Sequence, residues 1–321
     1  MNLRTIEEPK KLLDIAFSKG RKAASNYPKQ KTHFYTIKGK EIAKIDISAT
    51  YLEEVLSKTV VEFPSIKNLP LFYQDLFRLI IDQDELKKSL SNITSVSKII
   101  KTLRREKIIK LKELKFENGS VTFAKKISNE YFGRTSSLIK SLKKSISIYN
   151  DSVKKLKELP TIRAEEELYI LAGFPNVGKS TLLSKITESK PKVAAYPFTT
   201  QGLNVGVFFK KFLPCQVIDT PGLLDRELHK RNNIEKKAIS AFQYLKGTVL
   251  FVVDPTASLK EQKQLFLEIK KLFSEKGFIV VINKTDLATK EETSACINEF
   301  KDSYYILEGN GLDNLKQELL K

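Results

Sequence analysis

An eight-residue phosphate-binding motif constrains this chain more than any other feature. The segment Gly173-Phe174-Pro175-Asn176-Val177-Gly178-Lys179-Ser180 matches the pattern G-x-x-x-x-G-K-[ST]. It follows the apolar run 168–173 and precedes the run 179–189, which has helical spacing. Glycines let the backbone wrap phosphate groups, and the N–H groups at a helix N-terminus stabilise their negative charge. The motif therefore predicts a nucleotide site between a strand and a helix.

The side chains of this loop have separate expected roles. Lys179 is expected to reach the β- and γ-phosphates and to act in catalysis, and the Ser180 hydroxyl to ligate Mg²⁺. Thr181 is expected to donate to the α-phosphate. Asp219-Thr220-Pro221-Gly222 comes about forty residues later, at the end of a strand-like run. We expect Asp219 to hold Mg²⁺ through water and the N–H of Gly222 to meet the γ-phosphate, a second catalytic role.

A second loop, Asn283-Lys284-Thr285-Asp286, indicates which base is bound. The carboxylate of Asp286 can accept two hydrogen bonds, from guanine N1–H and N2–H₂. Adenine offers no such pair of donors, and an unmatched, desolvated carboxylate is costly, so discrimination should be steep. Asn283 is expected to tie this loop to the phosphate-binding loop, and the stem of Lys284 to lie over the base. The ordered motifs thus predict binding of GTP and GDP with Mg²⁺.

A third segment, Tyr196-Pro197-Phe198-Thr199-Thr200, lies where a switch would close over the γ-phosphate. Thr200 is expected to supply the second hydroxyl ligand of Mg²⁺ and to act in catalysis, with Thr199 as the alternative. Phe198 and Thr199 are included in the predicted nucleotide site. The other interpretation is that both threonines are ordinary loop residues.

The pattern of apolar residues divides the chain into two parts. Helical spacing in 10–25, 37–56, 69–90, 94–114 and 121–149 predicts an all-α helical bundle over residues 1–162. Residues 163–321 alternate between strand-like and helical runs, which predicts an α/β domain with a doubly wound, mostly parallel sheet.

The basic residues are concentrated in the first part. Residues 1–160 hold 33 Lys and Arg against 18 Asp and Glu, a net charge of +15 out of +18 for the whole chain. One face of the run 94–114 carries Lys98, Lys101, Arg105 and Lys112. Such charge contacts phosphates without reading sequence, so an RNA partner is expected, although a solvated surface is the alternative.

Several motifs together resemble the nucleolar GTP-binding protein 1 family, an Obg-type branch of the translation-factor-like GTPases. They are GFPNVGKST, YPFTTQG, DTPGLLDR, RNNIEKKAI and NKTD, with Phe63-Pro64-Ser65-Ile66, Tyr131-Phe132-Gly133-Arg134 and Leu159-Pro160-Thr161-Ile162 in the first part. The resemblance covers essentially the whole chain. It implies an archaeal-type member in which a helical domain precedes a P-loop GTPase domain, and a role in large-ribosomal-subunit assembly.

The resemblance also raises three points about the site. Leu223 stands where Ras-like proteins have a water-orienting Gln, which implies slow hydrolysis that another group must assist. Asn176 is similar to an asparagine that coordinates K⁺ in cation-activated relatives, but it can equally be a loop-stabilising residue. In the last base-contacting loop, Tyr305 and Ile306 stand where relatives have a Ser-Ala pair. This departure implies weaker binding of guanine, not a different base.

These observations favour a slow GTPase that docks on large-subunit rRNA and the pre-ribosomal particle. Two alternatives are a GTPase in another RNA process, such as tRNA modification, and a scaffold that binds GTP with negligible turnover. The N-terminus does not resemble a signal peptide, and the apolar runs are too short to span a bilayer. We therefore expect a cytoplasmic protein with no DNA or membrane partner, monomeric when free.

Overall fold

The chain folds into two compact units. The computed structural model describes residues 3–163, 166–187, 191–196, 202–227, 231–300, 304–306 and 311–320. The first unit comprises Met1–Ser65 and Ile81–Lys157, and the second comprises Ile66–Ile80 and Glu158–Lys321. The second unit is therefore built from two separate stretches of the chain.

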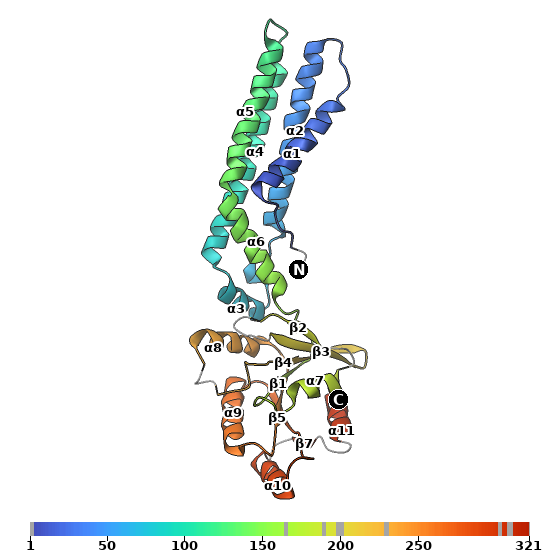
Figure 1. Cartoon of the computed structure of the whole chain (residues 1–321), viewed down its shortest axis with the longest axis vertical. Coiled ribbons are helices and arrows are strands. Elements are labelled where there is room, and N and C mark those ends of the chain that lie inside the picture. The colour runs from blue at the N-terminus through green and yellow to red at the C-terminus, as the bar shows by residue number, and fades with distance from the viewer. Residues whose placement is uncertain are drawn as a thin grey trace. The chain divides into compact units, whose positions relative to one another are not determined.

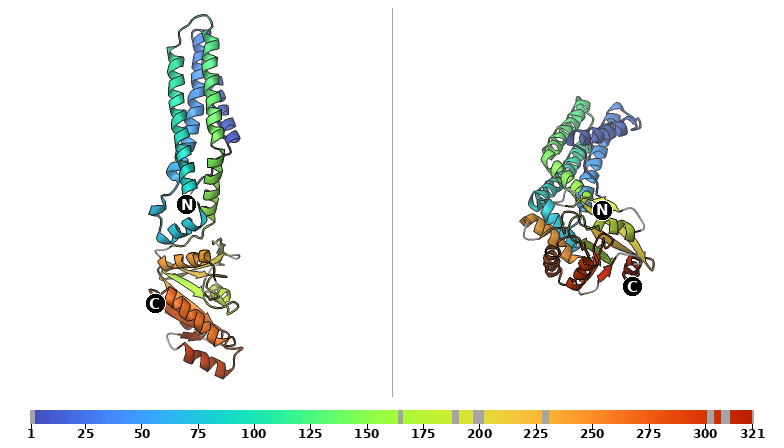
Figure 2. Two further views of the ribbon diagram at one scale, coloured as in Figure 1. Left: turned by 90° about the vertical axis from the view of Figure 1, so that its left-hand side faces the viewer. Right: turned by 60° about the horizontal axis from the view of Figure 1, so that its bottom comes forward.

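Long helices form the first unit and run alongside one another in both views of Figure 2. They are α1 (Pro9–Ser25), α2 (His33–Glu62), α4 (Gln83–Glu113), α5 (Ser120–Ser141) and α6 (Lys143–Glu158). Ile45, Ala49, Leu52 and Leu56 of α2 recur at helical spacing and are fully buried, so one stripe of the helix faces the core. No helix in the described part of the chain is both long and apolar enough to cross a bilayer.

Two of the expected helices are interrupted. The run 69–90 was expected to be continuous, but α3 (Leu71–Ile80) ends before Asp82, whose carboxylate caps α4 by accepting from the N–H groups of Asp84 and Glu85. The expected helix 121–149 also divides, because α5 ends at Ser141 and α6 begins at Lys143. Local capping chemistry decides the first break, and an apolar periodicity does not reveal it.

A seven-stranded sheet forms the centre of the second unit (Figure 1), in the order β2-β3-β4-β1-β5-β6-β7. The strands are β1 (Leu168–Ala172), β2 (Lys192–Ala194), β3 (Leu203–Lys210), β4 (Leu213–Asp219), β5 (Thr248–Val253), β6 (Gly277–Ile282) and β7 (Tyr304–Ile306). Strands β4, β1, β5, β6 and β7 are parallel to one another, whereas β3 pairs antiparallel with β4, and β2 pairs antiparallel with β3. The expected mostly parallel sheet is confirmed.

Helices cover both faces of this sheet. They are α7 (Lys179–Ile186), α8 (Asn233–Ser240) with the short helix η3 (Ala241–Tyr244), α9 (Leu259–Leu272), α10 (Lys290–Glu299) and α11 (Gly311–Leu319). Along β5, Val249, Phe251 and Val253 pack with α8, α9 and α10, whereas Leu250 and Val252 pack with α7 and α11. Alternate residues of a buried strand thus serve two cores, which explains its continuous apolar sequence.

The segment 66–80 belongs to the second unit, although it precedes most of the bundle in sequence. It contains the short helix η1 (Ile66–Asn68) and α3. Phe72 of α3 is fully buried, with ring centroids 5.8 Å from Phe242 and 6.5 Å from Tyr196. The hydroxyl of Tyr73 donates to the carbonyl of Ile162 at 2.8 Å. The expected division at residue 162 groups these residues with the bundle in sequence, and the apolar side chains of Phe72 and Leu76 pack in the core of the second unit.

Candidate nucleotide site

The phosphate-binding loop joins β1 to α7 and contains two glycines with left-handed backbone. Gly173 has φ of 136° and Gly178 has φ of 98°. A Cβ atom on Gly173 would lie 2.3 Å from the carbonyl oxygen of Val252, and one on Gly178 would lie 2.2 Å from Asn283 Nδ2. Both positions therefore require glycine for backbone conformation and for close approach.

The residues between these glycines fix the shape of the loop. Val177 is buried in the core, Phe174 is half-buried, and Pro175 and Asn176 are exposed. Asn176 has φ of 62°, a conformation that asparagine tolerates better than most residues. This supports the loop-stabilising interpretation of Asn176, while its contact with K⁺ stays a prediction.

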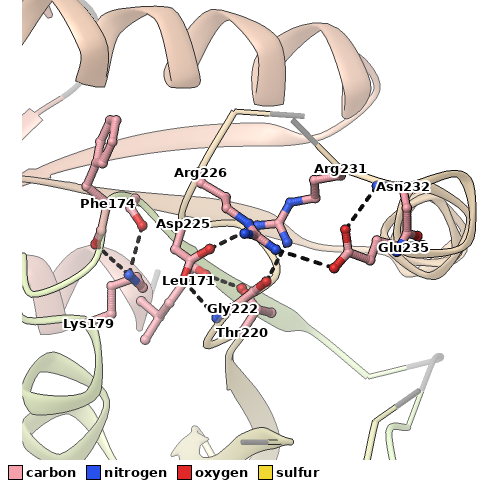
Figure 3. Close-up of polar contacts among 11 residues, drawn as sticks. Leu171, Phe174, Lys179, Thr220, Gly222, Asp225, Arg226, Arg231, Asn232 and Glu235 are labelled. Carbon is pink, nitrogen blue, oxygen red and sulfur yellow. Dashed lines mark hydrogen bonds and ion pairs between the residues drawn. The ribbon is translucent and has the colours of Figure 1, made fainter. Parts of the chain in front are cut away.

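Lys179 begins α7 and points back into the loop. Its Nζ donates to the carbonyl oxygens of Gly173 at 2.8 Å and Phe174 at 2.7 Å (Figure 3). The residue is 8% exposed, and burial lowers the pKa of its ammonium group, while the charges of Asp219 and Asp225 oppose that shift. A buried ammonium group at the mouth of the loop is suited to phosphate oxygens. Thr181, in the same first turn of α7, is exposed.

Ser180 and Asp219 lie together, as expected for a Mg²⁺ site. Ser180 Oγ donates to Asp219 Oδ2 at 2.6 Å, and Asn204 Nδ2 donates to the same oxygen at 3.1 Å. Asp219 is 1% exposed, and its Oδ1 has no hydrogen-bond partner among the described residues. A buried carboxylate oxygen without a donor is costly, so this atom fits a cation shell. Ser180 and Asp219 would hold Mg²⁺, which when bound neutralises phosphate charge.

The loop after β4 is fixed to β1 through Thr220, and its Gly222 is hydrogen-bonded to Asp225. Thr220 is fully buried, and its Oγ1 donates to the carbonyl of Leu171 at 3.0 Å, so this hydroxyl holds the loop on β1. Pro221 is half-buried. The N–H of Gly222 donates to Asp225 Oδ2 at 2.8 Å. Leu223 is fully buried in the core, where its side chain cannot orient a water molecule.

The loop Asn283-Lys284-Thr285-Asp286 is tied to the phosphate-binding loop as the sequence predicts. Asn283 Nδ2 donates to the carbonyl of Val177 at 2.9 Å. Lys284 has φ of 58°, and its Nζ donates to Asp254 Oδ2 at 2.8 Å. Asp286 is exposed, and its carboxylate makes no hydrogen bond to another described residue. The side chains of Asn283 and Lys284 therefore hold this loop in place, while the carboxylate of Asp286 is exposed.

Asp254, which follows β5, accepts the hydrogen bond that holds Lys284 of this loop. Its backbone N–H donates to Gln262 Oε1 at 2.9 Å, and its carbonyl accepts from Gln262 Nε2 at 2.7 Å. Burial disfavours the charged carboxylate, but hydrogen bonds from Lys284 and Thr256 outweigh burial and hold its pKa below the ordinary value. Asp254 thus fixes the ammonium group of Lys284.

Part of the predicted site lies outside the described residues. This applies to Phe198, Thr199 and Thr200, the predicted switch with its second Mg²⁺ ligand. The backbone of Tyr305 and Ile306 forms part of β7, but their side chains are likewise outside the description. Their roles toward the nucleotide stay predictions.

The sequence interpretation gave no role to four polar residues that the structure places around the loops. They are Asn204, Asp225, Arg231 and Asp254. Asp225 and Arg231 lie inside the motifs DTPGLLDR and RNNIEKKAI, which were used only for the family resemblance. Asn204 and Asp254 lie on or just after strands, where an isolated polar residue gives little signal.

Two family models match the chain. The model described as "NOG1 N-terminal helical domain" matches residues 2–163, and the one described as "50S ribosome-binding GTPase" matches residues 169–284. Together with the sheet topology, these matches confirm a helical domain followed by a P-loop GTPase domain.

Curated relatives match most of the chain. An uncharacterized protein of Methanocaldococcus jannaschii, MJ1408, is 35% identical over 89% of this chain and 81% of its own length. Nucleolar GTP-binding protein 1 of Drosophila melanogaster is 31% identical over 90% of this chain, and that of Encephalitozoon cuniculi is 31% identical over 92%. The matches span 44% and 56% of the length of these two proteins. A crystal structure of the putative Plasmodium falciparum protein of that name is 32% identical and covers 50% of this chain and 90% of its own, with a TM-score of 0.43.

Proposed function

Because the chain belongs to the nucleolar GTP-binding protein 1 family, we propose that it is a slow GTPase that assists assembly of the large ribosomal subunit. The hydrogen bond from Asn283 to the carbonyl of Val177 carries the guanine-nucleotide part of this proposal. It joins the loop that holds phosphates to the loop that carries Asp286, so one nucleotide can engage both.

Slow hydrolysis is expected from the residues of the loop after β4. Leu223 is fully buried and offers no polar group to a water molecule. Positive charge at the developing transition state must then come from another source, such as Lys179, a bound cation or a partner. A K⁺ ion near Asn176 is one such source. Turnover measured in K⁺ and in Na⁺ tests it, and equal rates in the two salts would exclude this ion.

The bundle supports docking on rRNA through exposed basic side chains. Lys98, Lys101, Arg105 and Lys112 of α4 are exposed, and none forms an ion pair with a described carboxylate. Arg104 differs, because its guanidinium pairs with Asp46 and Glu53. Lys107 is also different, since its side chain is 4% exposed and its Nζ lies 2.8 Å from Glu130 Oε2. These two residues hold the bundle together, so we assign the phosphate contacts to the four exposed residues named first.

Exposed aromatic rings accompany lysines at the ends of α2, α4 and α5. Tyr35 is 50% exposed, Phe116 70% and Phe123 51%. Phe34 packs between two of them, with ring centroids 5.2 Å from Tyr35 and 5.5 Å from Phe116. The exposed lysines beside them are Lys112, Lys115, Lys125 and Lys126. Unpaired RNA bases stack on such rings while lysines contact the backbone, which favours a single-stranded or looped rRNA element.

Co-sedimentation tests the ribosomal part of the proposal. The full chain, loaded with a non-hydrolysable GTP analogue, is expected to travel with precursor large subunits and not with free tRNA. Reversing the four exposed charges of α4 (K98E, K101E, R105E and K112E) should abolish this association at moderate salt. The same number of reversals on α9 (K260E, K263E, K270E and K271E) matches the change in net charge and should have little effect. Equal loss in both variants would indicate non-specific attraction.

The two alternative functions predict different results in these binding and turnover experiments. Preferential binding of free tRNA would indicate a GTPase of another RNA process. Guanine-nucleotide binding without turnover, with or without ribosomal subunits, would indicate a scaffold. Cytoplasmic location, a free monomer and the absence of DNA and membrane partners complete the proposal. The buried, unpaired thiols of Cys215 and Cys296 agree with a reducing compartment.

A further inference from the structure

Both backbone polar groups of Gly222, its N–H and its C=O, are hydrogen-bonded to side chains. Its N–H donates to Asp225 Oδ2 at 2.8 Å, and its carbonyl accepts from an Nη atom of Arg231 at 2.5 Å. The other Nη atom of Arg231 donates to Asp225 Oδ1 at 2.9 Å. Figure 3 shows the three residues facing one another, with Lys179 on the neighbouring loop. We call this closed set of contacts the Gly222 ring.

The Gly222 ring contains a buried side chain whose hydrogen bonding is incomplete, whereas Gly222 itself is exposed. The side chain of Arg231 is 0% exposed and that of Asp225 is 16% exposed. The Nε atom of Arg231 is also buried and has no hydrogen-bond partner among the described residues. A buried ion pair adds little net stability, and an unsatisfied donor beside it is costly. A structural role alone would be served better by apolar residues, so the polarity of the ring points to function.

The carboxylate of Asp225 interacts with two groups that would bind the γ-phosphate of GTP. The first is the N–H of Gly222, to which its carboxylate is hydrogen-bonded. The second is the ammonium group of Lys179, whose pKa the charge of Asp225 raises against the larger effect of burial. A carboxylate that serves both groups resembles a phosphate oxygen in charge and in acceptor chemistry.

We propose that Asp225 is a specificity-determining residue that competes with the γ-phosphate of GTP for the N–H of Gly222, and that Arg231 is the positioning residue that holds it there. This inference rests on the guanine-nucleotide binding proposed above. GTP must displace the carboxylate to engage Gly222, whereas GDP has no γ-phosphate and leaves the Gly222 ring closed. The ring therefore lowers the affinity for GTP relative to GDP.

Arg231 of the Gly222 ring lies two residues before the start of α8, so opening of the ring can be transmitted to this helix. Asn232 follows Arg231, and its side-chain oxygen accepts from the N–H of Glu235 at 2.7 Å, while Glu235 accepts from the N–H of Asn232 at 3.1 Å. Arg226 also donates to Glu235, at 3.3 Å. Displacement of Asp225 frees Arg231 beside this reciprocal cap, which makes α8 the helix that responds to the third phosphate.

The test measures the dissociation constants for GDP and for a non-hydrolysable GTP analogue by calorimetry on the full chain with Mg²⁺. D225N keeps the shape of the side chain but removes its charge. Since a charge-assisted hydrogen bond no longer has to be broken, D225N should bind the GTP analogue about 10-fold more tightly relative to GDP. R231Q should shift this ratio in the same direction, and the double variant should exceed D225N only slightly, because both act on one ring.

R226Q is the matched control, because Arg226 is half exposed and contacts Glu235 but not the Gly222 ring. It should leave the ratio of the two affinities unchanged. Melting temperatures taken with each variant separate a change of fold from a change of specificity, since loss of stability alone weakens both nucleotides alike. If D225N fails to fold, the ratio of the two affinities measured for R231Q decides the outcome.

The outcomes distinguish the inference from the function on which it rests. Wild-type protein that binds neither nucleotide would overturn both. Wild-type protein that binds both, with a ratio unmoved in D225N and R231Q, would overturn the role of Asp225 alone. A ratio shifted toward GDP in D225N would overturn it too, because the carboxylate would then assist the γ-phosphate.

Discussion

The nucleotide loops and the outer face of α4 both use positive charge, but they hold it differently. Lys179 and Lys284 are fixed by named acceptors, the carbonyls of Gly173 and Phe174 and the carboxylate of Asp254. The four basic residues on the outer face of α4 are exposed, and no described carboxylate pairs with them. They are Lys98, Lys101, Arg105 and Lys112. A fixed charge has already lost its conformational freedom and can bind one group in one geometry, whereas a free charge adds a small increment wherever phosphates lie.

This difference predicts how each region responds to substitution. In the loops a single side chain should decide binding, because its contacts are buried and cannot be replaced by water. On α4 the effect should be spread over many residues, with each loss small. The following changes probe that contrast, from the largest expected effect to the smallest.

Removing the ammonium group of Lys179 should give the largest effect. We expect K179A to lose charge-assisted contacts with the phosphates, so affinity for GDP and for GTP analogues should fall about 100- to 1,000-fold. Lys185, exposed in the last turn of the same helix, provides the control, and K185A should bind as the wild type does. Fluorescent-nucleotide titration measures both. A loss below about threefold in K179A would show that the backbone of the loop carries the binding.

Asp286 should decide the choice of base. In the wild type, guanine should be preferred to hypoxanthine, which lacks the 2-amino group, by about 10- to 100-fold. D286A should bind GDP and IDP equally, and both weakly. Competition titrations with the two nucleotides measure the ratio. Glu291, exposed at the start of α10, supplies a control carboxylate, and E291A should keep the preference. A preference that survives in D286A would place base recognition elsewhere.

A single exposed lysine of α4 should matter little. K98A should weaken binding to an rRNA fragment by less than about threefold and lower the slope of log affinity against log salt by about 0.7 to 0.9. The fourfold reversal described above should lose most of the slope. Filter binding across a salt series gives both values. A collapse of binding in K98A would mean that one lysine is as fixed as Lys179, which would remove the contrast.

The pH dependence of stability should give the smallest effect. The pKa of Asp254 is lower in the folded chain than in the unfolded chain, so its ionised form stabilises the fold. That contribution is complete above the unfolded pKa of about 3.9 and is lost as the pH falls through the folded pKa. D254N should therefore melt about 2–4 °C below the wild type at pH 6. The gap should narrow at lower pH in thermal unfolding curves, and a constant gap would assign the effect to packing.

Much of the nucleotide site could be predicted from sequence because its parts are local. The phosphate-binding loop is one continuous segment, and the contact of Asn283 with the phosphate-binding loop was predicted from its motif. The ion pairs of Arg104 and Lys107 could not be predicted, because charge alone does not show which lysine or arginine has a carboxylate on another helix. The Gly222 ring could not be predicted either, since it joins residues of an irregular loop that has no periodicity.

The fold was predicted where periodicity decides and was not predicted where long-range packing decides. The continuous apolar runs of β1 and β5 identify buried strands, and the apolar stripe of α3 shows which face is covered. That stripe does not reveal what covers it. Phe72 packs against Phe242, 170 residues further along the chain, and no local pattern encodes that pairing.

The discontinuous second unit has a consequence for the order of events during protein synthesis. Helix α3 leaves the ribosome long before the side chains that cover Phe72 and Leu76 have been made. At about 5–20 residues per second, the wait for Phe242 lasts roughly 10–30 s. The residues of α4, α5 and α6 emerge in that interval and can assemble with α1 and α2. The bundle is thus able to fold first, while an apolar helix stays uncovered and open to chaperones until the GTPase sheet is complete.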